Sequence, residues 1–256
     1  MMTDIIDYKI YGTEMQIVEV ELDPQEGVRA EAGTMIYMDN DIEMQTSTDG
    51  GLFKGFKRML TGESFFITTF LNRGRSKQHV AFSAPYPGNI IPIQLEDFNG
   101  RFICQKDAFL CAANGIEIEV EFTKRIGAGF FGREGFILQR LEGKGMAFVH
   151  AGGTIVEREL KANEVLRVDT GCLVGFSPTV DYDIQFIGGF KNALFGKEGL
   201  FLTKLTGPGK VYLQSLPLSR LSERLFSGIA SNKGENRGNI GGIAGGILGG
   251  FLGNDD

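Results

Sequence analysis

Short runs in which apolar and polar residues alternate recur along most of this chain. In Ile17–Leu22, Val and Leu alternate with glutamate, and comparable runs occupy Ile90–Leu95 and Ile155–Leu160. Alternation with a period of two residues is typical of a β-strand with one buried and one solvated face. Turn signals such as Pro85-Tyr86-Pro87-Gly88 separate the runs. Short strands with such turns between them predict an all-β sandwich or barrel.

A Gly-Glu motif recurs three times, each time just before an apolar run. Successive glutamates are 71 and 64 residues apart. Self-similarity at such a spacing indicates internal repeats. The motif positions are Gly62 and Glu63, Gly132 and Glu134, and Gly196 and Glu198.

Other segments recur in the same order around each motif, and they include the three alternating runs named above. Gly33–Tyr37, for example, matches Asp107–Cys111 and Gly171–Gly175. The sequence therefore predicts one β domain over residues 1–218, made of three tandem β-sandwich repeats arranged with pseudo-threefold symmetry, similar to a double-stranded β-helix. The predicted repeats span about 15–84, 88–151 and 153–216.

The pattern changes after Pro217. Ser219 can cap a helix, and Leu221, Leu225 and Ile229 follow at helical spacing, which predicts a short helix over 219–231. Residues 232–256 read as a flexible Gly-rich tail, because they begin with a polar, Gly-containing linker.

Glycine recurs every fourth residue in this tail, at Gly241, Gly245, Gly249 and Gly253. Two interpretations stay open: a flexible tail, or a helical segment 240–253 that associates with itself, with a partner protein or with a membrane surface. Fourteen helical residues reach only about 21 Å, short of the ~30 Å hydrocarbon core, so we do not expect the segment to span a bilayer.

Composition narrows the function classes. The net charge is -6, which argues against a nucleic-acid-binding protein. Three cysteines, Cys104, Cys111 and Cys172, do not form a disulfide framework and are typical of a reducing compartment. The N-terminus has no apolar core of a signal peptide. We therefore expect a cytoplasmic protein, either free or attached peripherally to a membrane through its tail.

Residues suited to catalysis are scarce. The two histidines, His79 and His150, do not supply a metal-binding set, and no G-x-S-x-G motif is present. None of the Gly-Lys pairs is followed by the Ser or Thr of a phosphate-binding loop. The sequence thus predicts a protein that is not an enzyme and holds no cofactor.

The three motif glutamates allow two interpretations. Carboxylates converging near a threefold axis could bind a cation. Alternatively, each Glu accepts hydrogen bonds from backbone N–H groups of its own Gly-rich turn, which we favour because buried polar groups are usually satisfied locally.

Several segments resemble a known family. They are Gly62–Phe66, Gly127–Gly135, Val156–Leu160, Gly188–Gly199 and the Gly-rich tail. They are similar to the bacterial and archaeal branch of the altered-inheritance-of-mitochondria family, member twenty-four. The resemblance covers about 15–218. It implies tandem β-sandwiches similar to the tryptophan RNA-binding attenuation protein, and no established enzymatic activity; eukaryotic members resemble inner-membrane organisation factors. RNA binding is not carried over to this acidic chain.

These observations lead to one functional hypothesis and two alternatives. We expect a non-catalytic scaffold or binding protein that forms homo-oligomers or attaches to a membrane surface or protein partner through its tail. The first alternative is a small-molecule or cation-binding protein that uses the pseudo-threefold axis. The second is an enzyme on a cupin-like barrel.

Overall fold

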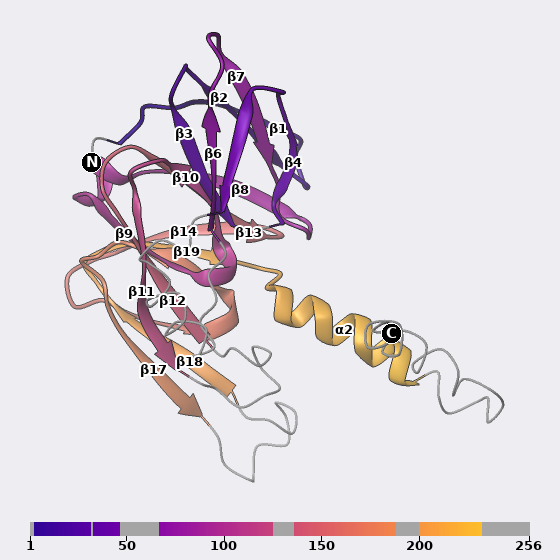
Figure 1. Cartoon of the computed structure of the whole chain (residues 1–256). Helices are drawn as coiled ribbons and strands as arrows, with labels where there is room; N and C mark the ends of the chain where they lie inside the picture. The colour runs from indigo at the N-terminus through magenta and orange to yellow at the C-terminus, as the bar shows by residue number, and fades with distance from the viewer. Residues whose placement is uncertain (1–2, 32, 47–66, 125–135, 188–199, 232–256) are drawn as a thin grey trace, which may run out of the picture. The chain divides into compact units, whose positions relative to one another are not determined.

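The structure, a computed structural model, describes most of the chain (Figure 1). Described are residues 3–31, 33–46, 67–124, 136–187 and 200–231. The chain divides into two compact units, residues 1–219 and 220–256. The Gly-Glu motif positions and the Gly-rich tail lie outside the described residues.

The prediction of an all-β protein is confirmed, because nineteen strands in four antiparallel sheets make up the described part of residues 1–219. After β1 (Asp7–Tyr11), the strands fall into three groups of six. The first strand group is β2 (Ile17–Leu22), β3 (Gly27–Glu31), β4 (Met35–Met38), β5 (Ile42–Thr46), β6 (Ile67–Asn72) and β7 (Gln78–Phe82). The second is β8 (Gly88–Gln94), β9 (Arg101–Gln105), β10 (Phe109–Ala113), β11 (Glu117–Lys124), β12 (Phe136–Glu142) and β13 (Met146–Gly152). The third is β14 (Ile155–Leu160), β15 (Val165–Asp169), β16 (Leu173–Phe176), β17 (Asp181–Ile187), β18 (Leu200–Thr206) and β19 (Gly209–Gln214).

Strands pair in the same way inside each group. The sixth strand lies between the first and third, as in β2-β7-β4, and the fifth lies between the second and fourth, as in β5-β6-β3. The corresponding strands of the second group pair alike. So do those of the third. Each group therefore supplies two three-stranded half-sheets.

Half-sheets of neighbouring groups join edge to edge. The second strand of one group pairs antiparallel with the third strand of the next, as β3 with β10 and β9 with β16. We call these two pairings the internal junctions. They create two six-stranded sheets, β5-β6-β3-β10-β13-β8 and β11-β12-β9-β16-β19-β14.

The series of groups is open at both ends. β4 is an edge of the sheet β1-β2-β7-β4, and β15 is an edge of the sheet β15-β18-β17. Among the described strands, these two do not pair with each other, although a closed threefold arrangement of the groups would require that pairing.

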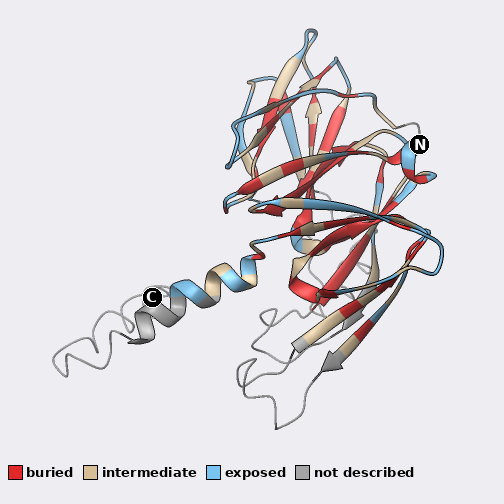
Figure 2. Ribbon diagram, turned by 180° about the vertical axis from the view of Figure 1, so that it is seen from behind, coloured by how far each residue is buried: buried red, intermediate tan, exposed pale blue. Residues whose placement is uncertain are grey.

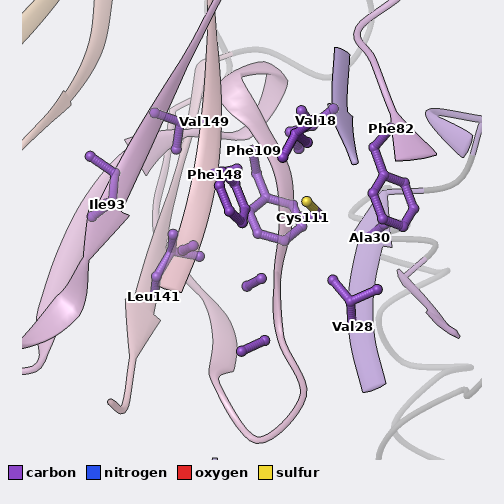
Figure 3. Close-up of a cluster of buried hydrophobic side chains, with 14 of the residues drawn as sticks. Val18, Val28, Ala30, Phe82, Ile93, Phe109, Cys111, Leu141, Phe148 and Val149 are labelled. Atoms are coloured by element: carbon purple, nitrogen blue, oxygen red, sulfur yellow. The ribbon is translucent and has the colours of Figure 1, made fainter. Parts of the chain in front are cut away.

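Alternation along the strands builds the core. In β2, Val18, Val20 and Leu22 are buried, while the residues between them are partly exposed. Buried residues recur along the strands of the body (Figure 2). One large cluster extends across the first two groups and includes Ala30, Cys111 and Phe148 (Figure 3). A second cluster lies mainly within the third group. Burying a side chain the size of Val or Phe contributes about 1.5–3 kcal/mol, so these clusters dominate the stability of the body.

Four short helical elements accompany the strands in the described ranges. The 3-10 helices η1 (Leu95–Phe98), η2 (Lys106–Ala108) and η3 (Thr170–Cys172) connect strands of the second and third groups. The helix α2 (Leu218–Ser231) lies where a helix over 219–231 is expected. None of the helices in the described ranges has the length and apolar character needed to cross a membrane.

Candidate interaction surface

The edge strand β4 exposes a row of large apolar side chains. Ile36, Tyr37 and Met38 have exposed fractions of 49%, 43% and 37%. A β-bulge between Met35 and Tyr37 interrupts the pairing of β4 with β7. Exposed apolar edges are unusual, because natural sheets protect their edges with charges, proline or a covering element.

The equivalent strands of the other two groups are buried throughout. Tyr37, Cys111 and Gly175 occupy equivalent positions in β4, β10 and β16. Each pairs with the sixth strand of its own group, at Ala81, Phe148 and Tyr212, and all three strands have a bulge at the same place. Every residue of β10 and β16 is buried, whereas no residue of β4 is. The difference arises because an internal junction covers β10 and β16.

A hydrogen-bonded row of side chains crosses the same sheet. Tyr11 of β1 donates its hydroxyl to Glu19 Oε1 at 2.8 Å, and Tyr37 of β4 donates to Glu19 Oε2. These two bonds, Tyr37 first, lower the pKa of Glu19. In return, donation to the charged carboxylate raises the pKa of Tyr37 to about 12. Glu19 therefore holds Tyr37 in place on the outer face of the sheet.

His79 lies beside this row between two carboxylates. Its Nδ1 is 3.1 Å from Asp39 Oδ2 and its Nε2 is 3.4 Å from Glu21 Oε2. Its backbone N–H also donates to Asp39 Oδ2, at 2.7 Å. Burial lowers the pKa of His79, but the hydrogen bond to Asp39 and the charge of Glu19 outweigh it, so the pKa is raised. Lys77 donates to Glu21 and completes the charged cluster.

This chemistry suits recognition. Both ring nitrogens of His79 already face carboxylates, so the imidazole is held as an ion-pair partner. Within the described ranges, no group of three His, Cys, Asp or Glu side chains is arranged to hold a metal ion. Among the described strands, β4 offers an unpaired edge, and the surface beside it carries two tyrosines, Ile36 and Met38. Aromatic residues and methionine are enriched at protein interfaces.

The other histidine belongs to the core. His150 lies in β13 with 2% of its surface exposed, its ring against Tyr86 at 4.6 Å between centroids. Burial lowers its pKa to about 4, so the ring is neutral near pH 7. Cys104 and Cys111 are also buried, and burial raises the pKa of both thiols. His150 therefore occupies an ordinary strand position, and Cys104 and Cys111 are small core residues, whereas Cys172 is only partly buried.

The residues that the sequence pattern singles out lie elsewhere. Gly62, Glu63, Gly132, Glu134, Gly196 and Glu198, and the tail glycines Gly241, Gly245, Gly249 and Gly253, all lie outside the described residues. The β4 row was not selected. The sequence does contain a signal for this row. At one aligned position of the third strands, the second and third copies have the small residues Cys111 and Gly175, whereas the first copy has the large Tyr37.

Comparison with known proteins gives a consistent family assignment. Residues 8–216 match the model of the Mitochondrial biogenesis AIM24 family. An uncharacterized protein of Streptococcus pyogenes serotype M6 is 28% identical over 220 residues, covering 83% of this chain and 86% of that protein. A crystal structure of a Streptococcus pyogenes protein superposes with a TM-score of 0.71 at 24% identity and covers 87% of this chain and 99% of the other. This last likeness supports the fold alone.

Proposed function

This chain belongs to the Mitochondrial biogenesis AIM24 family, and we propose that it is a non-catalytic scaffold or binding protein that takes a protein partner on the edge of β4. The observation that carries the proposal is the exposure of Ile36, Tyr37 and Met38, whose counterparts in the other two strand groups are buried under an internal junction.

The body of this scaffold is three tandem β-sandwich repeats similar to the tryptophan RNA-binding attenuation protein. The recurrence of one pairing scheme in three groups of six strands supports this part of the proposal. The repeats serve as a rigid frame for protein contacts, and the net charge of -6 favours that role over RNA binding.

The mode of binding is strand addition. An added strand forms main-chain hydrogen bonds to the open edge, and alternate side chains confer specificity. Burying the exposed parts of Ile36 and Met38 would add up to about 1–3 kcal/mol each, since both are already partly covered. Tyr37, held by Glu19, would enter the contact with little loss of side-chain freedom.

The C-terminal segment gives a second attachment. In this proposal residues 240–253, with glycine at Gly241, Gly245, Gly249 and Gly253, contact a membrane surface or a protein partner on the cytoplasmic side. Vesicle flotation of the full chain and of a chain ending at Ser231 tests this part. Flotation of the full chain alone supports it, and equal behaviour of the two chains contradicts it.

The main test is the mass of the native complex. The protein is isolated from its own cells under native conditions, as wild type and as Met38→Arg, which places a charge in the exposed row. A scaffold elutes above its 28.0 kDa monomer mass, and the variant elutes at a lower mass. Met44→Arg, the same change at an exposed methionine of β5, is the control and keeps the wild-type mass. A wild-type protein that elutes as a monomer contradicts the proposal.

A further inference from the structure

Two edge strands of the described body, β4 and β15, are the counterparts of the two strands that pair at an internal junction. Each junction joins the second strand of one group to the third strand of the next group. In the third group the second strand is β15, and in the first group the third strand is β4. Both are edges among the described strands. None of the other edge strands among the described residues corresponds to a strand that pairs across a junction; these are β1, β5, β8, β11, β14 and β17.

We propose that β15 of one copy of this chain pairs antiparallel with β4 of a second copy, which repeats the internal junction between molecules. This inference rests on the proposed function and names the partner at the β4 edge. Because the contact joins two different surfaces, copies associate head to tail, into a closed ring or an open filament depending on the rotation between them.

The internal junctions also define the register. Cys111 lies opposite Ala30, and Gly175 lies opposite Cys104. Pairing inside each group shows which residues correspond. In the second strands, the equivalent residues are Ala30, Cys104 and Val168. In the third strands, they are Tyr37, Cys111 and Gly175. The intermolecular pair therefore places Tyr37 opposite Val168.

The neighbouring position supports this register. Met38 would lie opposite Arg167, as Ala112 lies opposite Arg29 in the first junction. An arginine at this place is therefore compatible with the pairing. Arg29 Nη1 donates to the carbonyl of Ile116 across that junction at 3.0 Å. By the same geometry, Arg167 would donate to the carbonyl of Ile42, the equivalent of Ile116 in the first group.

Surface chemistry at both edges is consistent with a contact. β4 exposes Ile36, Tyr37 and Met38, and β15 exposes Val165, whose exposed fraction is 48%. At the second internal junction, Gly175, the third-group counterpart of Tyr37, is closely covered by the second group: a Cβ on Gly175 would lie 2.7 Å from the ring of Phe102. Leu166, the β15 equivalent of Phe102, would cover Tyr37 of the second copy.

The test uses the purified full-length chain and light-scattering chromatography over a dilution series. The wild-type protein is expected to have a mass that is a multiple of 28.0 kDa. If the copies form an open filament, this mass should fall on dilution. Met38→Arg places two arginines opposite each other, and like charges across strands destabilise the pair, so this variant is expected at 28.0 kDa. Adding Arg167→Glu to Met38→Arg creates opposite charges and is expected to restore the larger mass.

Controls separate pairing from folding. Met44→Arg, on the edge strand β5 but outside the predicted β4–β15 pairing and two residues beyond Ile42, is expected to keep the wild-type mass. Melting temperatures identify any variant that is unfolded; should Met38→Arg unfold, Tyr37→Lys at the adjacent exposed position replaces it, with the same expected mass.

Three results would overturn the inference: a wild-type monomer at every concentration, a Met38→Arg protein that keeps the larger mass, or a double variant that stays monomeric. If the purified chain is monomeric while the complex isolated from cells is larger and depends on Met38, the proposed binding function stands and this inference fails. If neither preparation exceeds the monomer mass, both fail.

Discussion

Tyr37 and Cys111 occupy the same position in two strand groups that pair alike, yet Tyr37 is 43% exposed and Cys111 is fully buried. The difference does not come from the local strand, because both lie on a strand with the same bulge and the same neighbour within the group. It comes from the presence of β3 beside β10 and the open edge beside β4.

Replacing Glu19 is expected to free Tyr37. The pKa of Tyr37 is raised to about 12 chiefly by its hydrogen bond to the Glu19 carboxylate. In Glu19→Gln the negative charge is gone, so the Tyr37 pKa should fall toward the ordinary value of about 10. NMR of ring-labelled tyrosine measures it, with Tyr37→Phe to assign the signal. A Tyr37 pKa that is unchanged in Glu19→Gln would show that the carboxylate does not hold this hydroxyl.

His79 should stabilise the fold at low pH. Its pKa is raised in the folded protein, so its contribution is fully present below the unfolded value of about 6.5 and is lost as pH rises through the folded pKa. The side chain is 38% exposed, and solvent screening limits the effect to below about 1 kcal/mol. Urea unfolding of wild type and His79→Gln across this range checks it. Identical pH dependence in the two proteins is the contrary outcome.

His150 should stabilise the fold at neutral pH and lose that contribution in acid, the opposite of His79. Its pKa is lowered to about 4 by burial, so its neutral form favours the folded state, and that stability is present above about pH 6.5 and lost as pH falls toward 4. The full change amounts to about 3 kcal/mol. His150→Gln, which introduces the residue type found at the equivalent Gln214, should remove much of this acid sensitivity. Urea unfolding in mildly acidic buffer measures it. An equally acid-sensitive variant would mean that another group is responsible.

Alternation of apolar and polar residues is sufficient to predict an all-β protein, because each strand has one buried face, as Val18 and Val20 show in β2. The same local pattern does not reveal which strands join between groups. Tyr37 and Cys111 have similar sequence contexts, and their environments differ only through pairing with strands far away along the chain. The exposed row therefore could not be predicted from periodicity. The burial of His150 against Tyr86 likewise depends on contacts between distant segments, which the local pattern does not contain.

Gly175 should tolerate no larger residue at the second internal junction. An added Cβ would lie 2.7 Å from the Ile103 carbonyl oxygen and from the Phe102 ring, so Gly175→Val should destabilise the protein by about 1–3 kcal/mol through overpacking. Tyr37→Val, at the equivalent exposed position, is the matched control and should change stability by less than about 1 kcal/mol. Denaturant unfolding compares the two. Equal effects of the two substitutions would argue against close packing at this junction.

The most direct test of the account is amide hydrogen exchange of β4 in the purified full-length protein, measured at high and low protein concentration. Pairing with a second copy would supply partners for the outward-facing amides, so exchange at residues 35–38 and 165–169 should slow as concentration rises. Exchange at residues 43–46 of the edge strand β5, which lie outside the predicted strand pairing, should stay constant. Exchange at β4 and β15 that does not depend on concentration, in a protein that remains monomeric, would contradict the predicted pairing.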